Sequence, residues 1–287
     1  MSLEPSLYPY QKNTLSINNA AQELKLNYID EGQGNPVVMV HGNPTWSFYY
    51  RKMVNKLKDQ NRCIVPDHIG CGLSDKPQDY SYRLENHINN LEKLIEHLGL
   101  EKIDLIVHDW GGAIGFGYAT RHPEKVNKIV ILNTAAFTSK NIPFRINLCR
   151  IPWLGEKFIR SFNGFAWPAT FMAVTKKMDP KVKKGYLYPY NNYKNRLATA
   201  RFVQDIPLNQ AHPSYQTLKD IEDKLHLLKG KKLIVWGKKD FCFNDSFLER
   251  WEKIYPEAQK IILDEAGHYV IEDCKEETLN LIKGFLK

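Results

Sequence analysis

The segment spanning residues 103–115 most constrains the fold, because it places an aspartate between an apolar strand and a glycine-rich helix start. Residues 103–107 have the length and composition of a buried strand, and Gly111-Gly112-Ala113-Ile114-Gly115 opens a helix that can pack closely. Asp109 occupies the turn, which is the place of the exposed nucleophile in a strand–nucleophile–helix elbow. Val107 departs from the strict pattern, which has a small residue there. The alternative is that Asp109 only caps the helix.

Further segments follow the chain order of an α/β-hydrolase, in which nucleophile, acid and histidine come after successive strands. Asp240 follows an apolar strand at residues 233–236, and His268 follows another at residues 261–263. Taken singly, the first could be a turn residue and the second an ordinary loop histidine. Because all three positions follow strand ends, we predict that Asp109, Asp240 and His268 lie together as nucleophile, acid and base.

Strand and helix patterns alternate along most of the chain, which predicts an α/β-hydrolase fold with a mostly parallel eight-stranded sheet and helices on both faces. The strands that we can place are residues 24–29, which we expect to be antiparallel, and 36–40, 63–65, 103–107, 129–132, 233–236 and 260–263. The helices that we can place, besides the one that opens at Gly111, are residues 46–57, 84–98, 247–254 and 276–286.

The alternation fails between residues 135 and 213, which are rich in Pro, Asn, Tyr and Phe. We expect a helical cap there, inserted after the sixth strand into a core made of residues 1–134 and 214–287. Such a cap would close over the strand ends and line an apolar pocket. A plain surface excursion is the alternative, but it would leave many aromatic side chains uncovered.

Composition excludes several classes of protein. No apolar run of about 18 residues could span a bilayer, and residues 1–10 lack the basic start and apolar centre of a signal peptide, so we expect a cytoplasmic protein. The five cysteines are scattered without zinc-ligand spacing, and we expect neither a metal nor a cofactor.

The net charge is +8, with eight Lys or Arg and one acid between Lys176 and Arg201. No nucleic-acid-binding motif accompanies this basic run, which is most simply a solvated surface, although an acidic partner or an anionic acyl chain would also fit.

The residue types define a chemistry. An aspartate nucleophile suits displacement at a saturated carbon, where it forms an alkyl ester and releases the leaving group as an anion. The side-chain N–H groups of Asn43, in the loop after residues 36–40, and of Trp110 could bind that anion, although Trp110 could also serve only in packing. His268, oriented by Asp240, would act as the base.

Two motifs carry a resemblance to a known family. His41-Gly42-Asn43-Pro44-Thr45-Trp46-Ser47 and His108-Asp109-Trp110-Gly111-Gly112 resemble the haloalkane dehalogenases. The resemblance implies Asp109 as nucleophile, Asn43 and Trp110 as halide-binding residues and His268 as base. One dehalogenase subgroup carries a glutamate after the sixth strand, where this chain has Asn133-Thr134, so the acid implied here is Asp240, after the seventh strand.

Other segments resemble the β-lactone decarboxylases of bacterial long-chain olefin synthesis more closely. They are residues 66–77, 133–137, 201–208 and 267–273. This resemblance implies a small hydrophobic substrate, a cis-3-alkyl-4-alkyloxetan-2-one, which loses carbon dioxide to give a cis-alkene. It also implies association with the β-lactone synthetase and a reductase of that pathway.

Three alternatives remain at this point. A haloalkane dehalogenase would use the same residues to hydrolyse an alkyl halide. An epoxide hydrolase would need two cap tyrosines over Asp109, and the candidates are Tyr186, Tyr188, Tyr190 and Tyr193. A non-catalytic ligand-binding protein with this fold would not need all three catalytic positions, which are filled here.

Overall fold

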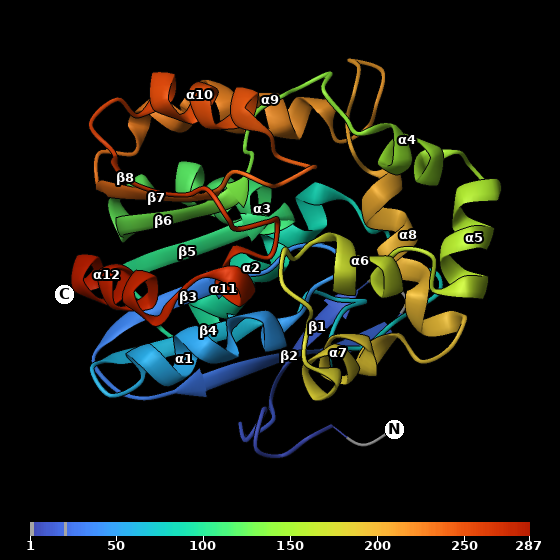
Figure 1. The fold of residues 1–287 in the computed structure, drawn as a ribbon, viewed down its shortest axis with the longest axis horizontal. Coiled ribbons are helices and arrows are strands. Elements are labelled where there is room, and N and C mark those ends of the chain that lie inside the picture. Colours follow the sequence, from blue (N-terminus) through green and yellow to red (C-terminus); the bar gives the residue numbers. More distant parts are fainter. Residues whose placement is uncertain (1–2, 20–21) are drawn as a thin grey trace.

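The structure, a computed structural model, describes residues 3–19 and 22–287, and an eight-stranded sheet runs through this part of the chain (Figure 1). The strand order is β1-β2-β4-β3-β5-β6-β7-β8. β2 pairs antiparallel with both β1 and β4, and the other neighbours are parallel. The strands are β1 (Asn13–Asn19), β2 (Gln22–Glu31), β3 (Asn35–Val40), β4 (Asn61–Pro66), β5 (Ile103–Asp109), β6 (Val126–Thr134), β7 (Lys231–Gly237) and β8 (Gln259–Leu263).

Helices cover both faces of the sheet. The helices of the core are α1 (Arg51–Leu57), α2 (Leu84–His97), α3 (Trp110–Arg121), α9 (Tyr215–Lys224), α10 (Asp245–Ile254), α11 (Val270–Asp273) and α12 (Glu276–Leu286). Short 3-10 helices are η1 (Ser47–Tyr50), η2 (Pro123–Lys125), η3 (Tyr188–Tyr190), η4 (Lys194–Arg196) and η5 (Leu225–Leu227).

Successive residues of the central strands enter two separate apolar cores, because side chains alternate between the faces of a strand. On β5, Leu105 and Val107 pack with residues of α2, α3, α9 and α10, whereas Ile106 packs with residues of α1, α11 and α12. Burial of each such side chain contributes about 1.5–3 kcal/mol. Strong packing on both faces fixes the strand ends at which the candidate site lies.

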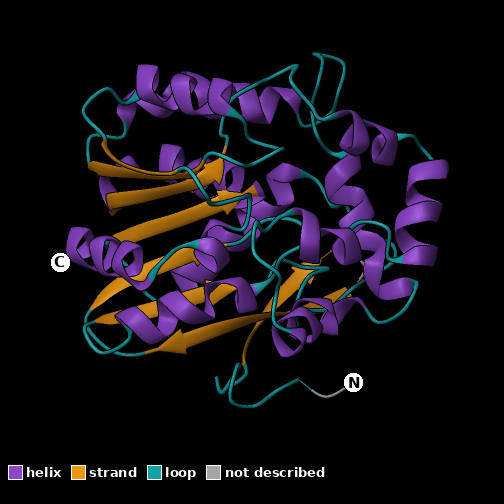
Figure 2. Ribbon diagram, in the orientation of Figure 1, coloured by secondary structure: helices purple, strands orange, loops and turns teal. Residues whose placement is uncertain are grey.

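The chain between β6 and α9 forms further helices, and we call residues 135–213 the insertion. Its helices are α4 (Phe144–Arg150), α5 (Leu154–Phe162), α6 (Ala166–Met172), α7 (Pro180–Leu187) and α8 (Leu197–Gln204). Figure 2 shows these helices gathered beyond the ends toward which the parallel strands β5, β6 and β7 point. The insertion therefore lies at the carboxyl edge of the sheet.

The predicted fold class is confirmed, and so are the strands that the sequence placed. The antiparallel strand expected at residues 24–29 is part of β2, and the closing helix at residues 276–286 is α12. The helix expected at residues 46–57 begins instead as η1 and continues as α1. The sequence did not place β1, because this edge strand carries only Leu15 and Ile17 as large apolar residues.

Candidate active site

Asp109 ends β5 and stands immediately before α3, with backbone angles φ 51° and ψ −127°. Residues other than glycine rarely adopt these backbone angles, and backbone strain of this kind is concentrated at functional sites. The carboxylate makes no capping hydrogen bond to α3, so the alternative of a simple helix cap is wrong. Its Oδ1 instead accepts a hydrogen bond from the backbone N–H of Asn43 at 2.6 Å.

Glycines make this sharp turn possible. A Cβ atom on Gly42 would lie 2.0 Å from Oδ1 of Asp109, and one on Gly111 would lie 1.9 Å from the carbonyl oxygen of Val40. Gly115 explains why Val107 is tolerated where the strict elbow pattern has a small residue. The Cγ1 of Val107 would lie only 2.6 Å from a Cβ on Gly115. Because Gly115 on the helix has no side chain, the larger side chain of Val107 fits on the strand.

The structure brings the three predicted residues together. His268 Nδ1 lies 2.8 Å from Oδ2 of Asp240, and His268 Nε2 lies 3.6 Å from Oδ2 of Asp109. Asp240 and His268 are buried, and Asp109 is mostly buried. The imidazole thus stands between two carboxylates, hydrogen-bonded to one and within reach of any group bonded to the other.

Two positioning residues were not predicted. Asn133, at the end of β6 with φ 25°, donates from Nδ2 to Oδ2 of Asp240 at 3.0 Å and exchanges two hydrogen bonds with the backbone of Gly237. Asn133 thus occupies the position after the sixth strand where one dehalogenase subgroup carries its acid, and here it supports Asp240. His108, directly before the elbow residue, lies with Nε2 2.8 Å from the carbonyl oxygen of His268. Burial lowers the pKa of His108 well below its usual value, so the neutral ring can donate this hydrogen bond.

Burial and charge act in opposite directions on the reacting groups. Burial raises the pKa of Asp109, while the charge of His268 and the backbone N–H groups of Asn43 and Trp110 lower it, and the net shift is upward. Burial lowers the pKa of His268, but the charges of Asp240 and Asp109, together with the hydrogen bond that His268 donates to Asp240, outweigh burial, and the net shift is again upward. Each of these two groups therefore stabilises the charged form of the other, against the effect of burial.

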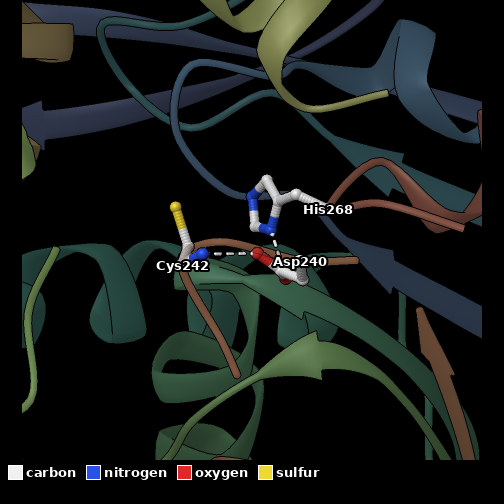
Figure 3. A group of neighbouring side chains, drawn as sticks. All are labelled: Asp240, Cys242 and His268. Carbon is white, nitrogen blue, oxygen red and sulfur yellow. Dashed lines mark hydrogen bonds and ion pairs between the residues drawn. The ribbon is translucent and has the colours of Figure 1, made fainter. Parts of the chain in front are cut away.

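Asp240, Cys242 and His268 also have the spacing of a possible metal site (Figure 3). Their chemistry argues for a different role. Cys242 reaches Asp240 through its backbone N–H, which donates to Oδ1 at 2.6 Å, and burial with two nearby carboxylates raises the pKa of the thiol well above its usual value. A thiol that stays protonated is a poor metal ligand, and His268 Nδ1 is engaged with the carboxylate.

The predicted anion-binding residues each line a cavity that also reaches Asp109, and the two cavities are different. Asn43 donates from Nδ2 to the carbonyl oxygen of Thr199 in α8 at 3.2 Å, which leaves the second amide hydrogen available. Its Oδ1 is buried and has no partner among the described residues. The ring of Trp110 packs edge-on against Phe202, with 5.4 Å between ring centroids. The role of both residues in binding an anion stays a prediction.

Two apolar cavities meet at Asp109. The larger has a volume of about 510 Å³, contacts Asn43 and His268, and is lined mainly by α4, α5, α6 and the segments that adjoin them. The smaller has a volume of about 140 Å³, contacts Trp110, and is lined by residues that follow β6, α8 and β7. Asp109, Ile146 and Cys242 line both. None of the four tyrosines that were candidates for the two cap tyrosines of an epoxide hydrolase lines either cavity.

A strand–aspartate–helix elbow with a histidine–aspartate pair at the carboxyl edge of a parallel sheet defines a class of protein. Residues 35–273 match the alpha/beta hydrolase fold family, and the chain belongs to it. It is 47% identical to the cis-3-alkyl-4-alkyloxetan-2-one decarboxylase of Shewanella oneidensis over 98% of this chain and 90% of the relative. It is 43% identical to the protein of the same name from Xanthomonas campestris pv. campestris, over 92% of this chain and 93% of the relative. A putative ancestral haloalkane dehalogenase structure matches with a TM-score of 0.84 and 25% identity, over 96% of this chain and 98% of that one. The predicted resemblance to these families is therefore confirmed.

Within residues 3–19 and 22–287, the structure contains no helix with the length and apolar character needed to cross a membrane.

Proposed function

We propose that the protein is a β-lactone decarboxylase, which converts a cis-3-alkyl-4-alkyloxetan-2-one to a cis-alkene and carbon dioxide. The observation that carries this proposal is the meeting of two apolar cavities at Asp109. A lactone with alkyl chains on adjacent ring carbons needs two apolar sites that diverge from one reacting group. The names of the two relatives above 40% identity support the same substrate class.

The first step uses the free oxygen of the nucleophile. Oδ1 of Asp109 is held by the Asn43 backbone N–H, so Oδ2 is the oxygen that attacks. It forms a bond to C4 of the lactone with inversion, and the bond from C4 to the ring oxygen breaks. The electron pair of that bond leaves on the ring oxygen, which becomes part of a free carboxylate. The side-chain N–H groups of Asn43 and Trp110 are the donors that we assign to this carboxylate.

The second step releases both products. The bond between C3 and the carboxylate carbon breaks, its electrons form the C3–C4 double bond, and the ester bond from C4 to Asp109 breaks. Carbon dioxide leaves and the aspartate carboxylate is regenerated, so no water or redox partner is consumed. Inversion followed by anti elimination amounts to net syn loss, and a cis lactone therefore gives a cis-alkene.

We assign His268 an electrostatic role in this sequence. Its raised pKa favours the imidazolium, which lies 3.6 Å from Oδ2 of Asp109 and can stabilise that oxygen as its negative charge returns in the elimination. A dehalogenase would instead need neutral His268 to activate water. Once Asp109 is esterified its charge is lost, which removes one of the causes that raise the pKa of His268.

The experiment that tests the proposal is a single turnover in ¹⁸O-labelled water. We expect a cis-dialkyl β-lactone to give cis-alkene and carbon dioxide, with no ¹⁸O in the peptide that contains Asp109, because no water attacks the aspartyl ester. Mass spectrometry of that peptide measures the label. Labelled Asp109 with a hydroxy acid product and no alkene would contradict the proposal.

Hydroxylamine in the same reaction distinguishes attack at C4 from attack at the lactone carbonyl. Attack at the carbonyl would give a mixed anhydride, which hydroxylamine traps, whereas attack at C4 gives an alkyl ester, which it does not trap.

Haloalkane dehalogenase activity is the second candidate. The observation in its favour is the placement of Asn43 and Trp110 beside Asp109, together with the structural match to a putative ancestral haloalkane dehalogenase. Incubation with 1,2-dibromoethane tests it. Rapid bromide release, ¹⁸O incorporation at Asp109 and no alkene from the lactone would favour the dehalogenase over our proposal.

Three further expectations belong to this proposal. We infer that the insertion, residues 135–213, acts as a cap over the site, because α4, α5, α6 and the segments that adjoin them supply most of the lining of the larger cavity. We also expect association with a β-lactone synthetase and a reductase, and a cytoplasmic location. Co-purification of the full chain with these two enzymes from cells that produce all three tests the association.

A further inference from the structure

The insertion carries an unusual surface. Ten of the fourteen large apolar side chains that are exposed among the described residues lie between Phe144 and Tyr193. Seven of them lie on α4, on α5 and between them. We call the six that follow Phe144 the mouth patch: Leu148, Ile151, Trp153, Leu154, Phe158 and Phe162. Trp153 and Phe162 are 72% and 74% exposed. Side chains of this size are costly to expose together, so the surface calls for a partner.

Most of the mouth patch also belongs to the lining of the larger cavity. Leu148, Ile151, Leu154 and Phe158 are exposed and also line the cavity that reaches Asp109. The same apolar side chains therefore face both the surroundings and the path to the candidate nucleophile. Whatever binds the mouth patch also controls what enters the cavity.

A basic hollow adjoins the mouth patch. Its volume is about 780 Å³, and its lining includes Arg83, Arg150 and Arg201 as well as Leu148 and Ile151, which it shares with the larger cavity. The first and third arginines pair with carboxylates, whereas Arg150 pairs with none among the described residues, and its Nε is buried without a partner there. The terminal nitrogens of Arg150 donate only to neutral oxygens, those of the Asn147 side chain and the Ile206 carbonyl. A guanidinium without a carboxylate partner, in a hollow beside an apolar entrance, matches an anionic head group joined to apolar chains.

The charge of the insertion favours the same kind of partner. The sequence from Phe144 to Arg201 has twelve Lys or Arg and two acids, so the net positive charge of this segment is larger than that of the whole chain. Two of the lysines lie over exposed aromatic rings, Lys157 over Trp153 at 5.4 Å and Lys183 over Trp167 at 5.0 Å. Aromatic rings flanked by basic side chains are typical of segments that lie in the interface of an anionic bilayer.

We propose that the mouth patch and its basic surroundings dock the protein on an anionic phospholipid bilayer, so that an apolar substrate enters the larger cavity directly from the lipid. Trp153 and Phe162 insert among the acyl chains, Lys157 stays at the level of the head groups, and Arg150 binds a lipid phosphate in the basic hollow. Docking does not depend on the reaction proposed above. A bilayer suits this surface because it supplies both negative charge and apolar contact around an open entrance.

Vesicle co-sedimentation of the full chain tests this inference. We compare vesicles of phosphatidylcholine alone with vesicles that also contain phosphatidylglycerol, and we expect clear binding only to the second, decreasing as salt is added. Lys157→Glu should weaken binding by at least about fivefold, the factor that corresponds to one basic group at an anionic surface. Trp153→Ser with Phe162→Ser should weaken it by a similar factor or more. The matched controls are Lys253→Glu on α10 and Leu281→Ser on α12, whose side chain is 51% exposed.

Figure 1 places α10 and α12 far from α5, so the controls should bind like the unchanged protein. Circular dichroism and thermal unfolding verify that every variant is folded. Equal binding to both kinds of vesicle, no binding to either, or equal losses in the patch variants and the controls would overturn the inference. Binding that survives in Asp109→Asn shows that docking is independent of the reaction, so a failure of the proposed function leaves this result standing.

Discussion

The core and the insertion of this protein are built on opposite principles. In the core, the groups proposed for the reaction lie at the ends of β5 and β6, at the start of α3 and in the loops that follow β3, β7 and β8. Glycines stand at the elbow because there is no room for a Cβ atom at these positions. In the insertion, short helices line the larger cavity and expose large apolar side chains. Rigid strand ends fix reacting atoms to fractions of an ångström, whereas short helices can vary the shape of the space around them. We therefore expect chemistry to depend on the core and substrate preference to depend on the insertion.

The largest expected effect is the loss of the proposed nucleophile in the core. Asp109→Asn should reduce turnover of the lactone by at least about 10⁴-fold, since removal of a nucleophile abolishes its reaction path. The same change should raise the free energy of unfolding at neutral pH. Burial raises the folded-state pKa of Asp109, so its ionised form destabilises the fold as the pH rises through that pKa. Alkene formation and urea unfolding measure the two effects.

The matched control for this variant is Asp104→Asn, another buried aspartate on β5. Asp104 accepts hydrogen bonds from Asn127 and Lys128 at the far end of the strand, so its replacement should leave turnover unchanged. Equal loss of turnover in both variants would mean that general damage to β5, and not the missing nucleophile, explains the result.

The pH dependence of turnover should also be set by the core. Turnover requires ionised Asp109, so it should fall by about tenfold per pH unit below the folded-state pKa, which burial holds above the ordinary aspartate value. If the imidazolium of His268 assists the elimination, turnover should also fall as the pH rises through the raised pKa of His268. A dehalogenase that needs neutral His268 would show the opposite change on this alkaline side. Initial rates across the pH range distinguish the two outcomes.

The support of Asp240 provides the next test. Asn133→Gly removes the side chain but suits the positive φ of this position, and we expect kcat to fall by about 10- to 100-fold with little change in KM. The reason is that Asp240 loses one of the hydrogen bonds that orient it toward His268. The pH profile should shift as well, because a less fixed Asp240 raises the pKa of His268 less. Unchanged kcat and an unchanged profile would show that Asn133 has only a structural role.

The sequence could predict the strand ends and the three acid and base positions, because these follow from local patterns. An apolar run followed by Asp109 and Gly111 is visible without knowledge of the rest of the chain. The pairing of Asn133 with Asp240 joins residues 107 positions apart, and the contact of His108 with His268 joins residues 160 positions apart. Neither contact leaves a local pattern, so sequence reasoning missed both supports.

The two cavities could not be predicted for a related reason. The linings combine residues that follow β6, β7 and β8 with short helices whose packing is not set by a strong periodic pattern. The composition of residues 135–213 indicated an apolar lining, but not that the space would divide at Ile146 and Cys242. The shape of a site lined by an irregular insertion depends on tertiary packing, whereas the elbow depends on a few adjacent residues.

Substitutions in the insertion should change selectivity and leave the chemical step intact. Ala169→Phe narrows the larger cavity, and we expect kcat/KM for a long-chain lactone to fall by about tenfold while a lactone with two short chains is converted as before. Ala135→Phe provides the comparison, because it narrows the smaller cavity and should penalise the other alkyl chain. Lactones with one long chain at C3 or at C4 measure which chain each cavity takes. Equal losses for all substrates in both variants would contradict separate sites for the two chains.

The smallest effect should come from a change chemically identical to Asn133→Gly but located in the insertion. Asn163 ends α5 with φ 52°, a left-handed position that glycine readily adopts. In Asn163→Gly, relief of the backbone strain stabilises the folded protein, whereas the greater entropy of the unfolded chain destabilises it. Each effect amounts to about 0.5–1 kcal/mol, so the free energy of unfolding should hardly change. Because Asn163 lines neither cavity at Asp109, kcat and the pH profile should also match those of the unchanged protein. A loss of kcat as large as that of Asn133→Gly would mean that the end of α5 helps to position the reacting groups, and the division of roles between core and insertion would not hold.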